Sequence, residues 1–214
     1  MSSTNQNTES SLYDKLLSIA WEKAVAKEKK QELEHLWASN LIYAYRYARF
    51  VLQNPWEPGE KVIASDPKYA YEYAHYVLQK PWPLGETAIA SNARYTYRYA
   101  LYVIKDAWPP GENVIASSPE HAYMYAHYVL QKPWPLGETA IASNPEYSYK
   151  YACNVIKGPW EPGEEAISSD PGYAYWYARF YIKNPWSLGE KAIASDPDWK
   201  SQYEKAFNVK LPNA

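Results

Sequence analysis

The sequence predicts an all-α protein, an α-solenoid of six 26-residue repeats with a capping helix at each end. Tryptophan recurs at a constant interval of 26 residues, at Trp56, Trp82, Trp108, Trp134, Trp160 and Trp186. Gly and Glu follow each of these tryptophans three and four residues later, and residues 73–92 are identical to residues 125–144. Such self-similarity is the signature of a repeat array, in which each unit buries its apolar surface against its neighbours.

Composition restricts the class of protein. The 214 residues are 47% hydrophobic, which suffices for one domain or one repeat array. A net charge of −2 argues against nucleic-acid binding, which needs a basic surface. The single cysteine, Cys153, excludes an internal disulfide and fits a reducing compartment. The chain has neither an apolar run long enough to cross a membrane nor a signal-peptide pattern, so we expect a cytoplasmic protein that does not bind membranes.

The amino-terminal part of the chain differs from the repeats. Residues 1–10 are polar, and we expect them to form a disordered tail. Residues 11–37 carry leucines among charged residues, which predicts an amphipathic helix that caps the first repeat. The helical repeat solenoid is then expected over residues 38–196. Its first long helix, residues 41–53, lacks the Asp-Pro start of the later ones.

Each repeat is predicted to hold one long and one short helix. The long helix begins at an Asp, Asn or Ser that can cap the first turn, usually followed by Pro at the first helical position. It runs for about 13 residues, as in residues 67–79, before the next proline stops it. The second segment, such as residues 85–91, is expected to form a short α- or 3₁₀-helix.

Helical geometry assigns the residues of the long helix to faces. The apolar side comprises Ala70, Ala74, Val77 and Leu78. The flanking tyrosines are Tyr69, Tyr73 and Tyr76 on one side and Tyr71 on the other, and we expect them to fill the grooves between repeats. The remaining face carries Lys68, Glu72, His75 and Gln79 and is expected to face solvent.

The last segment, residues 197–214, is predicted to be a polar carboxy-terminal cap. It keeps the aromatic positions Trp199 and Tyr203 of the repeat. It also carries the polar residues Lys200, Gln202 and Lys205.

The repeat unit resembles a known family. Its Asp-Pro start, Tyr-Ala-Tyr helix, Val155-Ile156-Lys157-Gly158 exit and Trp-x-x-Gly-Glu turn are similar to tandem repeats of tailed-bacteriophage proteins of unknown role. The unit is more loosely similar to the leucine-rich repeat variant, which alternates an α-helix with a 3₁₀-helix. The resemblance covers residues 38–209 and implies a helical solenoid. It assigns no activity and no site residues.

Most chemistry-bearing residues have a structural interpretation. We expect each Gly-Glu glutamate to lie in the first turn of a short helix, or to accept a bond from a neighbouring tyrosine hydroxyl, rather than to bind a cation. No metal-ligand spacing joins the four histidines or Cys153, and the chain has no phosphate-binding glycine loop. The sequence therefore predicts a protein that is not an enzyme and uses no cofactor or metal.

One column of the repeat varies freely, and this variation suggests a binding surface. Glu72 becomes Arg98, Met124, Lys150 and Trp176 in later repeats, which a packing position would not tolerate. Trp and Arg are frequent in binding hot spots, so Trp176 beside Arg179 is the strongest candidate contact. The candidate protein-binding residues are Arg46, Arg49, Arg98, Leu101, Met124, His127, Lys150, Trp176, Arg179 and Lys183.

Three functions remain open at this point. The first is a scaffold that binds a host protein, such as an antiviral defence factor, in the bacterial cytoplasm; the phage-like resemblance alone suggests this partner. The second is a sponge for a nucleotide-like signal, held in aromatic pockets between repeats or protomers. The third is self-assembly into a homo-oligomer.

Overall fold

The computed structural model describes residues 27–212 and their side chains from residue 32 onwards. The expected disordered tail, residues 1–10, and most of the expected amino-terminal capping helix, residues 11–37, lie outside the described residues. Over the described range the chain is helical throughout and contains no strand. No helix in that range has the length and apolar character needed to span a bilayer.

The described chain divides into two compact units. The first unit ends at Ile104 and the second begins at Lys105. The helices of the first unit are α2 (Lys27–Ala38), α3 (Leu41–Arg46), η1 (Tyr47–Leu52), α4 (Glu57–Ile63), α5 (Pro67–Tyr73), η2 (Ala74–Leu78), α6 (Pro83–Ile89), α7 (Ala93–Tyr99) and η3 (Ala100–Ile104). Here η marks a π-helical segment.

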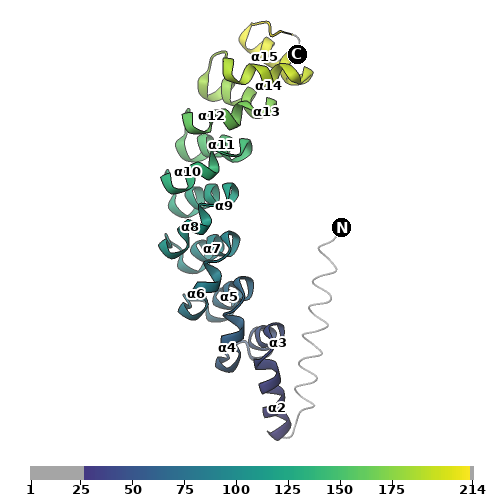
Figure 1. Cartoon of the computed structure of the whole chain (residues 1–214), viewed down its shortest axis with the longest axis vertical. Helices are drawn as coiled ribbons and strands as arrows, with labels where there is room; N and C mark the ends of the chain where they lie inside the picture. Colours follow the sequence, from purple (N-terminus) through teal and green to yellow (C-terminus); the bar gives the residue numbers. More distant parts are fainter. Residues whose placement is uncertain (1–26, 213–214) are drawn as a thin grey trace. The chain divides into compact units, whose positions relative to one another are not determined.

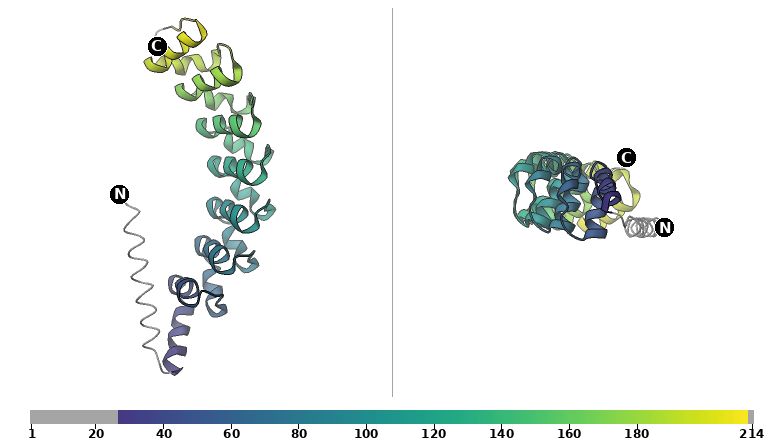
Figure 2. Two further views of the ribbon diagram at one scale, coloured as in Figure 1. Left: turned by 180° about the vertical axis from the view of Figure 1, so that it is seen from behind. Right: turned by 90° about the horizontal axis from the view of Figure 1, so that it is seen from below.

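The second unit repeats this order. Its helices are α8 (Pro109–Ile115), α9 (Pro119–Met124), η4 (Tyr125–Leu130), α10 (Pro135–Ile141), α11 (Pro145–Tyr151), η5 (Ala152–Ile156), α12 (Glu161–Ser168), α13 (Pro171–Tyr177), η6 (Ala178–Ile182), α14 (Ser187–Ser195) and α15 (Pro197–Phe207). Within each unit the long helices form one layer and the short helices a second, which Figure 1 shows from one side and Figure 2 from behind. The protein is therefore an all-α solenoid of helix pairs, as the 26-residue period predicts.

The long helices begin as their capping residues predict. The Asp66 carboxylate accepts hydrogen bonds from the backbone N–H groups of Lys68 (2.9 Å) and Tyr69 (3.0 Å). In the first long helix Asn40 takes this role and accepts from Ile42 and Tyr43, both at 3.1 Å. A side chain that caps two free N–H groups fixes where each helix starts, even where the Asp-Pro pair is missing.

The ends of the long helices differ from the prediction. We expected one continuous α-helix, but its last five or six residues form a π-helix, as in η2. The segment ends at a residue in the left-handed conformation, such as Gln79 with a φ of 53°. The wider π-helical turn changes the angle between successive side chains. Tyr76, assigned to a packing flank from α-helical geometry, is consequently 47% exposed.

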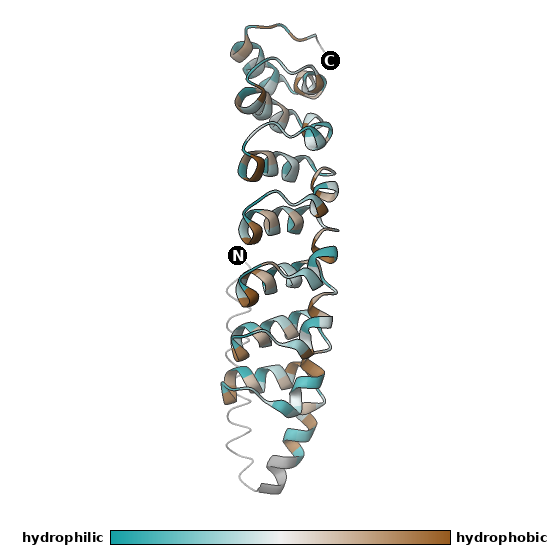
Figure 3. Ribbon diagram, turned by 90° about the vertical axis from the view of Figure 1, so that its left-hand side faces the viewer, coloured by the Kyte–Doolittle hydropathy of each residue, from teal (hydrophilic) through white to brown (hydrophobic). Residues whose placement is uncertain are grey.

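The short helices are α-helices that begin directly after each tryptophan, two residues earlier than expected at Pro83. Each places one fully buried isoleucine, such as Ile89, against the long helices. Most of the remaining core consists of aromatic residues and alanine. The tryptophan and a tyrosine of each described repeat are buried, and so are small residues such as Ala70 and Ala74. Figure 3 shows pale and teal colours along most of each long helix, because tyrosine has a low hydropathy even where its ring is buried.

The carboxy-terminal helix α15 is a single α-helix, capped by Asp196 and ended by Asn208 in the left-handed conformation. Its Tyr203 is fully buried, whereas Ser201 and Gln202 are exposed. Trp199 packs against Tyr175 of α13, with ring centroids 5.4 Å apart.

Candidate functional site

A buried tyrosine links each long helix from α5 onwards to the short helix that precedes it. The Tyr73 hydroxyl accepts a hydrogen bond from the backbone N–H of Trp56 (2.8 Å) and donates one to the Glu60 carboxylate (2.9 Å). The same pair of bonds is made by Tyr99, Tyr125, Tyr151, Tyr177 and Tyr203. This confirms the structural interpretation of the Gly-Glu pairs.

These bridges also explain the protonation state of the buried tyrosines. Burial, together with the bond to the Glu190 carboxylate, raises the pKa of the Tyr203 hydroxyl to about 12. The bond from the Trp186 N–H acts in the opposite direction but is a smaller effect. The phenols therefore stay neutral, so that they can donate to the glutamates.

The candidate binding residues lie along the outer side of the long helices, but most are half-buried rather than fully solvated. Arg179 and Lys183 are exposed. The half-buried ones are Arg46, Arg49, Arg98, Leu101, Met124, His127, Lys150 and Trp176. Four of them, Arg49, His127, Lys150 and Trp176, pack on rings of the same or the next repeat.

In the first unit these contacts form a continuous line. Arg49 lies over the ring of Tyr76 at 3.9 Å and over that of Phe50 at 4.9 Å. The His75 ring lies 4.4 Å from Tyr76 and 5.6 Å from Tyr102. We call the line of Phe50, Arg49, Tyr76, His75 and Tyr102 the aromatic row. Its outer rings Tyr76 and Tyr102 are 47% and 48% exposed.

Arg49 is held in this row by further polar contacts. Its guanidinium donates a hydrogen bond to the Tyr45 hydroxyl and lies 3.9 Å from the Glu72 carboxylate. An arginine that is held between aromatic rings in this way is already ordered before a partner binds. Binding to it costs less side-chain entropy than binding to a mobile arginine.

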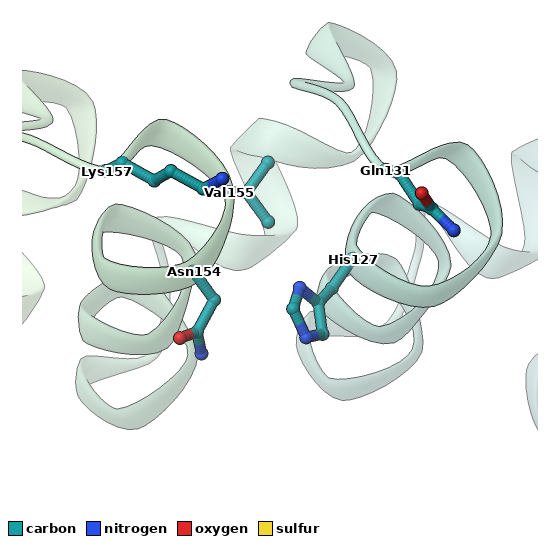
Figure 4. Close-up of a pocket in the computed structure, with 5 residues that line it drawn as sticks. All are labelled: His127, Gln131, Asn154, Val155 and Lys157. Atoms are coloured by element: carbon teal, nitrogen blue, oxygen red, sulfur yellow. The ribbon is translucent and has the colours of Figure 1, made fainter.

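In the second unit the same line is interrupted. His127 stacks on Tyr123 and meets Tyr128, as His75 stacks on Tyr71 and meets Tyr76. Where Tyr102 follows in the first unit, however, this unit has Asn154. A cavity of about 390 Å³ opens there, lined by His127, Gln131, Asn154, Val155 and Lys157. Figure 4 shows the His127 ring on η4 and the Asn154 amide on the neighbouring helix η5, with Lys157 extending toward Val155.

Trp176, proposed from the sequence as an exposed contact, is half-buried in an aromatic cluster. Its ring stacks on Phe180, with centroids 5.4 Å apart and an interplanar angle of 7°. It also meets Tyr175 at 5.0 Å and Trp199 at 5.9 Å. Phe180 is the more accessible ring, with 50% of its surface exposed, and the neighbouring Arg179 is exposed too.

The one cysteine lies in a tyrosine environment. The Cys153 thiol is hydrogen-bonded to Tyr149 and Tyr181, and burial raises its pKa, so it stays protonated. A thiol in this state is a poor nucleophile. Across residues 32–212, no cluster of three or more His, Cys, Asp and Glu side chains has the arrangement of a metal site.

The sequence reasoning missed the exposed aromatic column, because it assigned these rings to packing. A signal was nevertheless present in the sequence. The column reads Phe50, Tyr76, Tyr102, Tyr128, Asn154 and Phe180. An asparagine would be costly at a buried aromatic position, so its presence indicates that the column reaches solvent.

The chain matches no known family model, no curated protein sequence and no solved structure at a significant level. Any function must therefore be argued from the fold and from the surface that the fold presents. These define a helical repeat protein with a variable, partly aromatic outer face.

Proposed function

We propose that the protein is a non-enzymatic scaffold that binds another protein through the outer side of its long helices. The observation that supports this most is the recurring half-exposed ring. Tyr76, Tyr102, Tyr128 and Phe180 are between 47% and 50% exposed, one per repeat. Large accessible rings beside arginine have the composition of interaction hot spots.

The side chains around these rings supply the means for specificity. The framework of Tyr, Glu and Trp bonds is the same in every repeat, so differences at the surface leave the fold unchanged. Beside the rings the chain presents Arg98, Met124, Lys150 and exposed Arg179 in successive repeats. A partner that binds several repeats would therefore contact a different set of side chains in each one.

The resemblance of the repeat unit to tailed-bacteriophage repeats suggests a host protein as the partner, in the bacterial cytoplasm. A factor of antiviral defence or regulation is the proposed target. This choice rests on the resemblance alone, whereas the binding surface rests on the exposed rings.

The test compares two double variants that remove large side chains of similar exposure from different layers. Tyr102→Ala with Phe180→Ala removes rings from the long-helix layer. The matched control, Leu84→Ala with Leu188→Ala, removes side chains that are 54% and 51% exposed on the short helices. A partner is first captured from host lysate with the unaltered protein, purified, and titrated against both variants.

We expect the ring variant to weaken binding about tenfold or more and the control to bind normally, since few interface residues carry most of the energy. Equal affinities for both variants, at unchanged thermal stability, would refute the assignment of the surface. Sedimentation of the protein alone identifies the case in which the bound partner is a second copy of this chain.

A further inference from the structure

The cavity at Asn154 has a matched counterpart inside the same chain. Residues 73–92 and 125–144 are identical, so His75 and His127 share the two residues before them and the 17 residues after them. Each histidine stacks on the tyrosine four residues before it, at 5.6 Å and interplanar angles of 10° and 8°. The next repeat then differs, because it offers Tyr102 to His75 but Asn154 to His127.

The two positions therefore differ by one aromatic ring. The Tyr102 ring lies 5.6 Å from the His75 ring at 47°, and it occupies the space beside the histidine. At the other position, Asn154 donates a hydrogen bond from its amide to the Tyr123 hydroxyl (2.8 Å), which draws the short side chain to one side. His127 and Asn154 both line the cavity of about 390 Å³.

The volume and the shape of the cavity suit a planar ligand. Small-molecule sites in proteins have volumes of about 300–1,000 Å³. The outer edge of His127 provides an aromatic surface, and the Val155 side chain provides an apolar wall. A ring bound there would take the place that Tyr102 fills beside His75.

The polar groups that line the cavity indicate that its ligand carries hydrogen-bonding and charged groups in addition to an aromatic ring. Gln131 and Asn154 carry amides, which can each donate and accept, as the edge of a nucleobase requires. Lys157 supplies an ammonium group, and none of the five lining residues is acidic. A phenol ring with one hydroxyl would leave most of these groups without a partner, whereas a base with a phosphate would use them.

We propose that this cavity is a binding site for a nucleoside monophosphate. The base packs against the His127 ring, as Tyr102 packs against His75, the amides of Gln131 and Asn154 bond to its edge, and Lys157 pairs with the phosphate. This site goes beyond the proposed scaffold function and does not depend on it, since Tyr102 and Phe180 do not line the cavity.

The test uses the full chain and two reciprocal substitutions. Asn154→Tyr places in this repeat the residue found at positions 76, 102 and 128, so the variant is expected to fold and to fill the cavity. Tyr102→Asn is the converse change and opens the equivalent place beside His75. Calorimetric titration and ligand-observed NMR are run with AMP, GMP, CMP and UMP. Ribose 5-phosphate and N-acetyl-tyrosinamide serve as the non-nucleotide probes.

We expect at least one nucleotide to bind the unaltered chain at one site. Asn154→Tyr should weaken nucleotide binding about tenfold or more, because its ring would occupy the place of the base and remove the contact between the base and His127. Tyr102→Asn should retain the original site and gain further nucleotide binding. Ribose 5-phosphate should bind much more weakly, because it has no base.

Three results would overturn the proposal. One is that none of the four nucleotides binds, and another is that Asn154→Tyr binds them as well as the unaltered chain does. The third is that N-acetyl-tyrosinamide binds and the nucleotides do not, which would make the cavity a receptor for a tyrosine side chain of a protein. None of these results affects the outcome of the ring-variant titration, so the two proposals fail separately.

Discussion

Replacing Tyr151 by phenylalanine tests whether the buried tyrosine bridge holds neighbouring repeats together. The Tyr151 hydroxyl accepts from the Trp134 backbone N–H at 2.8 Å and donates to the Glu138 carboxylate at 2.9 Å, and the side chain is fully buried. The phenylalanine ring keeps the packing, including the contact with Trp160 at 4.8 Å, but it removes both hydrogen bonds. The change in stability therefore reports on the two bonds alone.

The expected loss of stability depends on the two hydrogen-bond partners, the Trp134 N–H and the Glu138 carboxylate, once the hydroxyl is removed. The Trp134 N–H stays buried without an acceptor, which costs about 1–3 kcal/mol. The Glu138 carboxylate is only half-buried and can bind water instead, so its contribution lies near the lower end of the usual range of about 1.5–3 kcal/mol. Together the two losses should destabilise the fold by about 2.5–4.5 kcal/mol, which corresponds to a fall in Tm of about 5–18 °C for a chain of this size.

The assay is urea and thermal unfolding followed by circular dichroism, with Tyr128→Phe as the matched control. Tyr128 is 49% exposed, so loss of its hydroxyl should change stability by no more than about 0.5 kcal/mol. Equal destabilisation by the two substitutions, or no effect of either, would refute the role of the bridge.

Two further predictions concern packing and pH. Gly137→Ala should destabilise the protein by about 1–3 kcal/mol, because the added Cβ would lie 2.5 Å from the Trp134 ring. Gly158→Ala, where nothing lies within 4 Å of the added Cβ, should be neutral or slightly stabilising in the same urea titration, and a reversed order would contradict this packing argument. Stability should also fall at alkaline pH. Burial raises the pKa of Tyr203 from 10.0 to about 12, so its stabilising contribution is complete below pH 10 and is lost as pH rises through about 12. Urea midpoints measured across this range, with tyrosinate absorbance recorded in parallel, check this; a constant midpoint would show that the buried phenols do not limit stability.

Much of the architecture could be predicted from local rules. Asp66 and Pro67 mark a helix start in any context, because the cap and the proline act on the first turn alone. The constant interval of the tryptophans required a stack of equivalent units. The prediction that the Gly-Glu glutamates accept tyrosine hydroxyls also followed, because a role present in every copy has to serve the repeat itself.

The candidate site was less accessible to this reasoning. The α-helical projection assigned Tyr76 to packing and Trp176 to the solvent-exposed face. In the structure Tyr76 is 47% exposed and Trp176 is half-buried. The π-helical segments change the direction in which side chains point after Ala74 and its equivalents. No local residue preference predicts a π-helix at this place. Trp176 is covered because Trp199 lies beside it, 23 positions further along the sequence.

The sequence by itself determined the all-α repeat, its period, the helix starts and the roles of the Tyr, Glu and Trp framework, since each depends on neighbours at fixed spacing. Only the tertiary structure decided which rings reach solvent and that a cavity opens beside His127. These depend on how a side chain of one repeat fits against the next. A single Asn154 in place of a ring alters that fit without disturbing any local pattern.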